Sequence, residues 1–218
     1  MKLPNYSDVE ERMNYLTHGF AALVSIVGFF VLLYYSSFHN DNYFWFGTIV
    51  FGISLITAFT ASTFYHGVKQ AKWKGWFRLI DHLAIYFLIA GSYSPFTLGN
   101  LRNEWGWYVF ILIWVLAIGG MVFKFIIRHK VDDYTHFDAY FYAGIGCVAI
   151  PFLGSIISNV ETVGCMLLIA GGALYLTGVF FYLNEKIPYN HAIWHLFVMA
   201  AAGMHYFAVL WYATPPIG

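Results

Sequence analysis

The sequence has few charged residues for its length. Lys, Arg, Asp and Glu make up 10% of the 218 residues, against about 25% in a typical soluble domain. Their charges cancel, with 11 basic and 11 acidic side chains, so no overall field favours nucleic acid or an acidic substrate as a partner. Apolar residues make up 60% of the chain. This balance indicates a protein that is surrounded by lipid and excludes a large soluble core.

Cysteine is scarce, and no cleavable leader is evident. Cys147 and Cys165 fall in different apolar segments at different expected depths, so we expect free packed thiols and no disulfide. The start of the chain is polar and acidic, which does not match a signal peptide. Ser7 and Glu10 fit a capping box, which predicts either a short interfacial helix or a cytoplasmic tail. Without repeats or linkers, residues 1–218 are expected to form one domain.

Long apolar runs dominate the rest of the sequence. Seven of them are long enough to cross a bilayer, which takes about 20 residues each. They predict an all-α integral membrane protein, a bundle of seven transmembrane helices with short connections. The predicted spans cover residues 17–36, 44–66, 79–98, 105–127, 137–157, 162–183 and 189–212.

The basic residues predict the orientation of this bundle. With seven spans, the N-terminus shares one side with the second, fourth and sixth connections, and of all Lys and Arg residues only Arg102 falls on the opposite side. Basic residues are retained in the cytoplasm, so we expect a cytoplasmic N-terminus and an extracytoplasmic C-terminus. This is the reverse of a G-protein-coupled receptor. The tryptophans expected at the outer interface are Trp45, Trp105, Trp107 and Trp211.

Four ionisable side chains are predicted to share one membrane depth. His66 ends the second span, Asp81 begins the third, and His191 and His195 begin the seventh, all on the cytoplasmic side. Ionisable groups inside a membrane are costly and usually mark a function or a buried partner. Because the orientation rests on Lys and Arg alone, the common depth of the four groups independently indicates one site.

The histidines predict a metal site. Residues at i and i+4 lie on the same helix face, so His191 and His195 can bind one ion together. His66 adds a third imidazole and leaves a fourth position open, as in catalytic zinc sites. Ser62 lies one turn before His66 on the same face, where its hydroxyl can serve the outer shell. Two histidines that merely hydrogen-bond carbonyls or tyrosines remain the alternative.

Asp81 is the carboxylate available to such a site. In the soluble motif H-E-x-x-H the general base lies between the two histidines, whereas here Ala192, Ile193 and Trp194 intervene. Asp81 is therefore expected to orient a bound water and accept its proton. An ion pair with Arg78 or a cap for the third span are the alternatives.

The remaining histidines have other expected roles. Haem ligation by His191 and His195 is disfavoured, because one helix cannot offer ligands to both faces of a porphyrin. His205 lies ten residues deeper than His195 and is expected to be buried and hydrogen-bonded. His82 points about 100° away from Asp81 around its helix. The histidines at predicted span ends or in loops are expected to be solvated, namely His18, His39, His129 and His136.

At these residues the chain resembles a known family. The stretches "ASTFYH", "DHLAIYFLIAGSYSPF" and "IPYNHAIWHLFV" are similar to the hemolysin III family, within the wider group of progestin and adiponectin receptors and alkaline ceramidases. The resemblance implies zinc held by His66, His191 and His195, with Ser62 and Asp81 close to a bound water. It also implies seven helices around a cavity open to the cytoplasm and inner leaflet. The chain lacks the long N-terminal region of the animal receptors and resembles the bacterial branch, which predicts the bacterial cytoplasmic membrane as its location.

Three functions follow as hypotheses. The first is a zinc-dependent hydrolase of a lipid amide or ester, with membrane lipid as its substrate and no nucleic acid partner. The second is a metal-binding sensor or regulator of membrane state, and the third is a pore-forming cytolysin. Polar groups cluster at one end of the spans, whereas a pore requires polar stripes through the whole membrane. The sequence therefore favours a site over a pore, and it predicts no particular oligomeric state.

Overall fold

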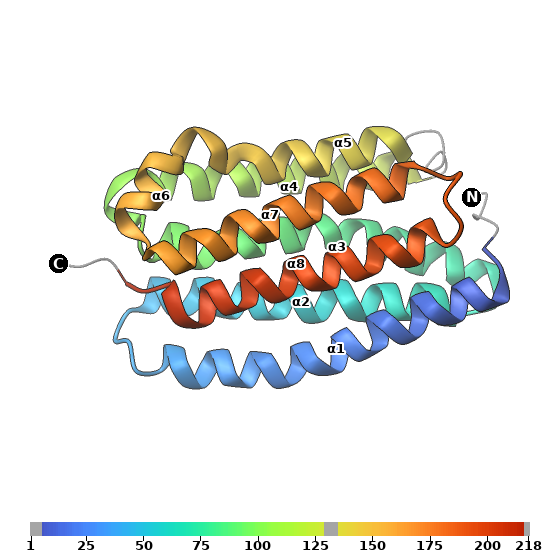
Figure 1. Cartoon of the computed structure of the whole chain (residues 1–218), viewed down its shortest axis with the longest axis horizontal. Coiled ribbons are helices and arrows are strands. Elements are labelled where there is room, and N and C mark those ends of the chain that lie inside the picture. Colours follow the sequence, from blue (N-terminus) through green and yellow to red (C-terminus); the bar gives the residue numbers. More distant parts are fainter. Residues whose placement is uncertain (1–5, 129–134, 216–218) are drawn as a thin grey trace.

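The computed structural model describes residues 6–128 and 135–215, and every element in these ranges is helical. The helices run back and forth, side by side, along one common axis (Figure 1). α5 and α6 together make a single crossing. The elements are α1 (Asp8–Ser36), α2 (Asn42–Gly67), α3 (Ala71–Leu98), a π-helical turn (Arg102–Gly106), α4 (Trp107–Ile126), α5 (Thr135–Gly146), a 3-10 segment (Cys147–Phe152), α6 (Leu153–Asn159), α7 (Thr162–Leu183) and α8 (Asn190–Tyr212).

In the part of the chain that the structure describes, six helical segments are long and apolar enough to cross a membrane, by length and composition: Asp8–Ser36, Asn42–Gly67, Arg102–Ile126, His136–Asn159, Thr162–Leu183 and Asn190–Tyr212. The protein is therefore an all-helical, multi-pass membrane protein, as predicted. α3 is also long, with 28 residues, and lies within the same bundle. It is absent from the six because Asp81, His82 and the polar residues near Pro95 lower its hydropathy.

The outer surface of the bundle is apolar. Phe20, Leu23, Val27 and Phe30 of α1 are each more than half exposed. They recur every three or four residues, so they form one stripe along the helix. An exposed apolar stripe of this length is stable only against lipid or another apolar surface, which agrees with a membrane location.

Two helix starts and one interrupted helix differ from the sequence prediction. α1 begins at Asp8, where the Ser7 side chain accepts a hydrogen bond from the backbone N–H of Glu10 at 3.2 Å, so the capping residue starts the first long helix and not a separate one. α3 begins at Ala71, a further two turns before the predicted span. The predicted fifth span is broken into α5, the 3-10 segment and α6. Pro151 lies in the 3-10 segment, where its missing N–H prevents a continuous α-helix.

The end of the bundle remote from the N-terminus is tied by polar contacts. Arg102 donates two hydrogen bonds of 2.6 Å to the Asp41 carboxylate, which holds the pKa of Asp41 below its usual range. The Asn100 amide donates to the backbone carbonyls of Asn159 and Tyr212, both at 3.1 Å. The backbone N–H of Thr214 donates to the Asn100 carbonyl oxygen at 2.9 Å. These bonds connect the loops and helix ends of this face.

A buried ion pair joins α4 to α5. Lys124 and Asp138 are both buried and in direct contact, and His82 of α3 lies 4.0 Å from the same Asp138 oxygen. Removing one partner of a buried pair leaves an uncompensated charge, which typically costs about 3–5 kcal/mol. Replacing both partners with apolar side chains of similar volume removes that cost.

We therefore expect Lys124→Met to lower the free energy of unfolding by about 3 kcal/mol or more, and Lys124→Met with Asp138→Val to restore most of it. Denaturant titration of the purified protein in detergent measures both changes. Lys186→Met, at an exposed position, is the matched control. A single variant as stable as the control would show that this pair does not hold the two helices together.

Candidate metal centre

The three predicted histidine ligands meet at one end of the bundle. His66 lies in the last turn of α2, and His191 and His195 lie in the first turns of α8. The last turn of α2 and the first turn of α8 lie at the same end of the bundle as the start of α1 (Figure 1). Each histidine offers one ring nitrogen such that all three atoms lie within 4.8 Å of one another. Their exposed fractions are 4%, 5% and 0%.

The turn between α7 and α8 fixes the direction in which α8 starts. The Asn190 amide donates to the carbonyls of Phe181 and Tyr182 at 3.2 and 3.1 Å, and so satisfies carbonyls that the end of α7 leaves open. Tyr189 adopts a left-handed conformation with φ of 58°, which is uncommon for a bulky residue. This sharp turn sends His191 and His195 into the bundle.

The spacing of His66 and His191 fits a shared ion. Their Nε2 atoms lie 3.2 Å apart. Ligand nitrogens around a tetrahedral zinc ion at 2.0–2.1 Å are about 3.3 Å apart. The other ring nitrogen of each histidine has a partner outside the cluster: Nδ1 of His66 lies 2.6 Å from Glu11 Oε2, and Nδ1 of His191 lies 3.1 Å from Tyr6 Oη. Nδ1–H groups that donate to these oxygens leave the two Nε2 lone pairs facing each other.

His195 supplies the test of whether these residues suit a metal ion. Its ring is fully buried, and within residues 6–128 and 135–215 neither ring nitrogen has a partner in hydrogen-bond geometry. The centre of the ring lies 4.6 Å from that of His191 and 5.1 Å from that of His66. An unpartnered buried polar group is costly. A cation held between the three rings satisfies His195 and separates the facing lone pairs, so the site fits a metal ion.

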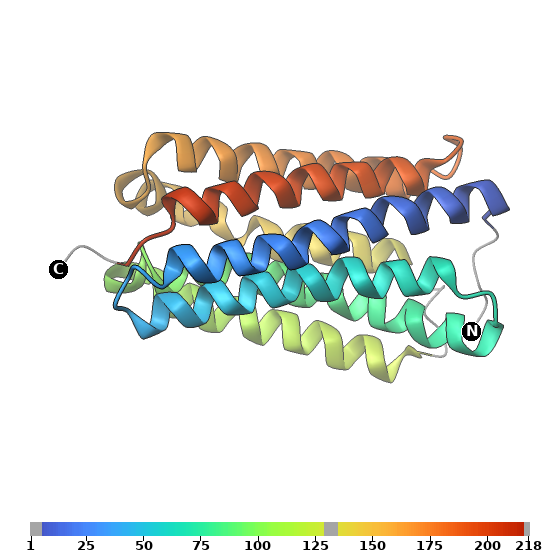
Figure 2. The ribbon, with the colours of Figure 1, turned by 90° about the horizontal axis from the view of Figure 1, so that it is seen from below.

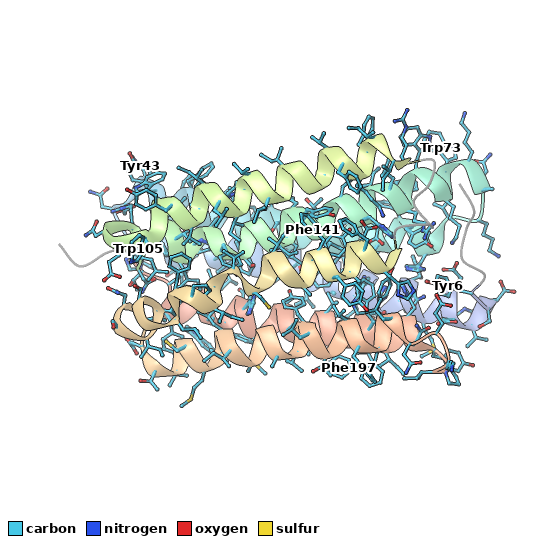
Figure 3. The ribbon with its side chains drawn as sticks, turned by 90° about the horizontal axis from the view of Figure 1, so that it is seen from above. Tyr6, Tyr43, Trp73, Trp105, Phe141 and Phe197 are labelled. Atoms are coloured by element: carbon cyan, nitrogen blue, oxygen red, sulfur yellow. The ribbon has the colours of Figure 1, made fainter. Side chains whose placement is uncertain are left out.

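Glu11 and Tyr6 form an outer layer that sequence reasoning missed. Glu11 bridges His66 to Lys74, whose ammonium lies 2.8 Å from the second carboxylate oxygen. Carboxylates commonly hold metal-binding histidines in this way and fix their tautomer and orientation. Tyr6 lies at the same end of the molecule (Figure 3). The acidic start of α1 was visible in the sequence, but its contact with His66 depends on where α1 begins.

Ser62 and Asp81 are both buried, and Ser62 belongs to the same helix as His66. Ser62 lies one turn before His66, and its hydroxyl faces the Asp81 carboxyl group without a partner in hydrogen-bond geometry. Among the described residues, Asp81 does not belong to the group of atoms that can share one ion. Its proximity to Ser62 is the link between Asp81 and the helix that carries His66, and its catalytic role remains a prediction.

His18 differs from expectation. It was predicted to be solvated at a span end, but its ring is buried and stacks on His195 with the ring centres 3.5 Å apart and the planes 10° apart. The prediction was wrong because α1 begins at Asp8, which places His18 well inside the helix. His136 is exposed and His39 is partly exposed.

Two further histidines lie away from the centre, and one predicted residue lies outside the described ranges. His82 approaches Asp138 at 4.0 Å, in agreement with its predicted direction away from the site. His205 Nε2 lies 3.2 Å from the carbonyl oxygen of Leu168, so the expected hydrogen bond is present, although the residue is partly and not fully buried. His129 falls in the part of the chain that the structure does not describe.

The sequence over residues 6–206 matches the family described as Haemolysin-III related. The chain belongs to this family. It is 40% identical over 207 residues to Hemolysin-3 of Bacillus cereus, covering 94% of this chain and 93% of that protein. It is 35% identical over 205 residues to the Hemolysin-3 homolog of Bacillus subtilis (strain 168), covering 94% and 95%.

A human relative belongs to the same set of similar proteins. The chain is 34% identical over 210 residues to the Monocyte to macrophage differentiation factor of Homo sapiens, covering 92% of this chain and 83% of that protein. No solved structure matches the chain. The family assignment made from the three sequence stretches is confirmed, and with it the location of a multi-pass protein in a cell membrane.

Proposed function

We propose that this member of the Haemolysin-III related family is a zinc-dependent hydrolase that cleaves an amide or ester bond of a membrane lipid. One observation carries the proposal: three buried histidines converge on one point. Ser62 lies one turn before His66, and the buried Asp81 lies close to Ser62. Catalytic zinc sites use three protein ligands and keep the fourth position for water or substrate. The Ser62 hydroxyl and the Asp81 carboxyl group are then available for chemistry.

The ligand set supports zinc among the common metals. All three ligand atoms are imidazole nitrogens, whereas calcium and magnesium prefer oxygen. Imidazole suits zinc, copper, iron and nickel. The 3.2 Å between the Nε2 atoms of His66 and His191 is close to the spacing around a tetrahedral zinc ion, which favours zinc. When held by these three histidines, zinc would supply Lewis-acid chemistry, in which a carbonyl group is polarised and the pKa of a bound water is lowered.

The residues of the chain supply the remaining functions. Asp81 orients water, accepts its proton and passes that proton to the amine or alcohol that leaves. Ser62 can donate a hydrogen bond to Asp81 or to an oxygen of the bound lipid. Glu11 and Tyr6 hold His66 and His191 in the orientation that binds the metal. The low exposure of all these groups excludes bulk water from the reacting atoms.

A seven-span topology with a cytoplasmic N-terminus completes the proposal. α3 counts as the seventh span, because it lies within the bundle and connects α2 to α4. The metal centre then lies at the cytoplasmic end, at the depth of the inner leaflet, where membrane lipids are the molecules at hand. The bilayer and a membrane lipid are accordingly the proposed partners.

Cysteine labelling tests this topology. In a variant without Cys147 and Cys165, a single cysteine at Asn40 should react with a membrane-impermeant reagent from outside. A single cysteine at Gln70 should react only from inside, because the α2–α3 connection lies on the cytoplasmic side. Labelling of both positions from the same side of sealed vesicles would contradict the seven-span arrangement.

A regulator without catalysis is the second candidate. The three ligands are almost completely buried, and Tyr6 lies over His191 with the ring centres 4.8 Å apart. Such a closed site also suits a protein that senses a metal or the state of the membrane. A pore has less support despite the name of the Bacillus relatives. The buried ionisable side chains of the described helices gather toward the end that holds the metal centre, whereas a pore requires polar groups through the whole membrane.

A turnover assay separates hydrolase from regulator. The purified protein in lipid nanodiscs is given defined lipid amides and esters, first loaded with zinc, then stripped with a chelator, then reloaded. A hydrolase releases fatty acid only in the two zinc-loaded states. If the zinc form releases none from any ceramide, phospholipid or related amide tested, the regulator is the better description.

A further inference from the structure

α1 contributes no ligand to the metal centre, yet it contacts two of the three ligands. Glu11 and His18 are seven residues apart, two helical turns, and so lie on one face of α1. Glu11 accepts a hydrogen bond from His66, and the His18 ring packs on His195. Figure 2 shows α1 lying against α2 and α8, the helices that carry all three histidines. This face of α1 therefore forms a wall of the centre.

The three ligands differ in how their rings are held. His66 and His191 each have an outer hydrogen-bond partner, Glu11 and Tyr6. Such partners normally set the orientation of a metal-binding imidazole. Neither nitrogen of His195 has a partner among the described residues. Apart from an approach to the backbone of Asn14, the orientation of its ring therefore depends on contacts with other rings.

Stacking provides that contact. The rings of His18 and His195 are nearly parallel, with an interplanar angle of 10° and 3.5 Å between their centres. The neighbouring rings of His191, His66 and Trp194 meet His195 at steep angles of 57°, 74° and 53°, so they do not set its plane in this way. His18 is itself held by the ring of Phe59, which meets it edge-on at 5.1 Å.

The same geometry separates His18 from the ligands. An imidazole binds a metal ion that lies close to its own ring plane. An ion in the plane of His195 lies about one stacking distance, 3.5 Å, out of the plane of His18. His18 therefore cannot bind that ion with the rings in this arrangement, and His18 is not in the group of atoms that can share one ion.

We propose that His18 is a positioning residue, which holds the ring of His195 by stacking so that one nitrogen faces His66 and His191. This role rests on the proposed metal centre but not on hydrolysis. This role requires a flat aromatic ring at position 18, but it does not require the ring to contain nitrogen. Loss of an outer-shell residue typically weakens metal binding by about 10- to 100-fold.

Cobalt binding tests the role without any activity assay. Co²⁺ replaces zinc in sites of this kind, and its visible absorption bands report the ligand geometry. Full-length protein in detergent is stripped of metal and titrated with Co²⁺ against a competing chelator. The variants are His18→Phe, which keeps a ring, and His18→Leu, which keeps apolar volume alone. Thr17→Val is the control, because the Thr17 hydroxyl bonds only to carbonyls of its own helix, those of Met13 and Asn14.

We expect His18→Phe and Thr17→Val to bind Co²⁺ within about threefold of the parent protein with unchanged bands. His18→Leu should bind about 10- to 100-fold more weakly with shifted bands. Its metal-free fold should persist, because leucine removes two buried nitrogens that have no partner, and the metal-free thermal midpoint verifies this. A His18→Leu spectrum and affinity equal to the parent would overturn the proposal. So would equal losses in His18→Phe and His18→Leu, which would show that the nitrogens act. A parent protein that binds no Co²⁺ would refute the metal centre itself.

Discussion

Asp81→Asn is expected to reduce lipid hydrolysis by about 10²- to 10⁴-fold, the usual contribution of a general acid or base, while zinc content and folding stay unchanged. Asparagine has nearly the same shape as aspartate and keeps the contact with Ser62, but it cannot accept a proton from water. Because Asp81 lies outside the group of atoms that can share an ion, its replacement leaves all three ligands in place.

Two other roles for Asp81 give different results. As a metal ligand, it would lose zinc on replacement. As the ion-pair partner of Arg78, it would lose stability while activity per folded molecule is preserved. Zinc content, thermal midpoint and lipid turnover should therefore be measured for the parent protein, Asp81→Asn and Arg78→Gln. Full turnover by zinc-loaded Asp81→Asn would remove Asp81 from the chemistry.

Replacing any one of His66, His191 and His195 with Ala is expected to weaken zinc binding by more than about 100-fold. Loss of an outer-shell partner alone costs about 10- to 100-fold, and loss of a direct ligand leaves two imidazoles that lipid cannot supplement. The measurement is zinc content after equilibration with a chelator of known affinity.

His205→Ala is the matched control for these variants, since it removes the same chemistry from α8. His205 bonds to the Leu168 carbonyl and lies outside the metal-binding group, so the variant should retain zinc. Stoichiometric zinc in a variant that combines His66→Ala with His191→Ala would show that other residues bind the metal.

Much of the site could be predicted because the position of a residue within an apolar run indicates its depth in the membrane. The unequal distribution of Lys and Arg between the two sides predicted that the end of α2 and the start of α8 share one side of the membrane. In the structure His66 and His191 indeed approach to 3.2 Å. The pattern of apolar runs predicted the helices, since each crossing must satisfy its backbone hydrogen bonds internally.

Features that depend on packing between helices could not be predicted. Hydropathy locates the apolar part of a helix, but the helix can include polar turns before that part. α1 begins at Asp8, more than two turns before the predicted apolar span. That extension brings Glu11 to His66 and buries His18 against His195. The break in the fifth span follows from Pro151. The sequence prediction used only the length of the apolar run, so it treated the span as one continuous helix. Contacts between distant segments, such as Tyr6 with His191, leave no local signal.

X-ray absorption at the zinc edge tests the three-histidine centre most directly, because it counts the atoms around the metal in the intact protein. The structure predicts one zinc per chain with three imidazole nitrogens and one further light atom at about 2.0–2.1 Å. In His195→Ala the imidazole signal should fall to two or the metal should be lost. A sulfur neighbour, fewer than three imidazoles in the parent protein, or an unchanged spectrum in His195→Ala would contradict it.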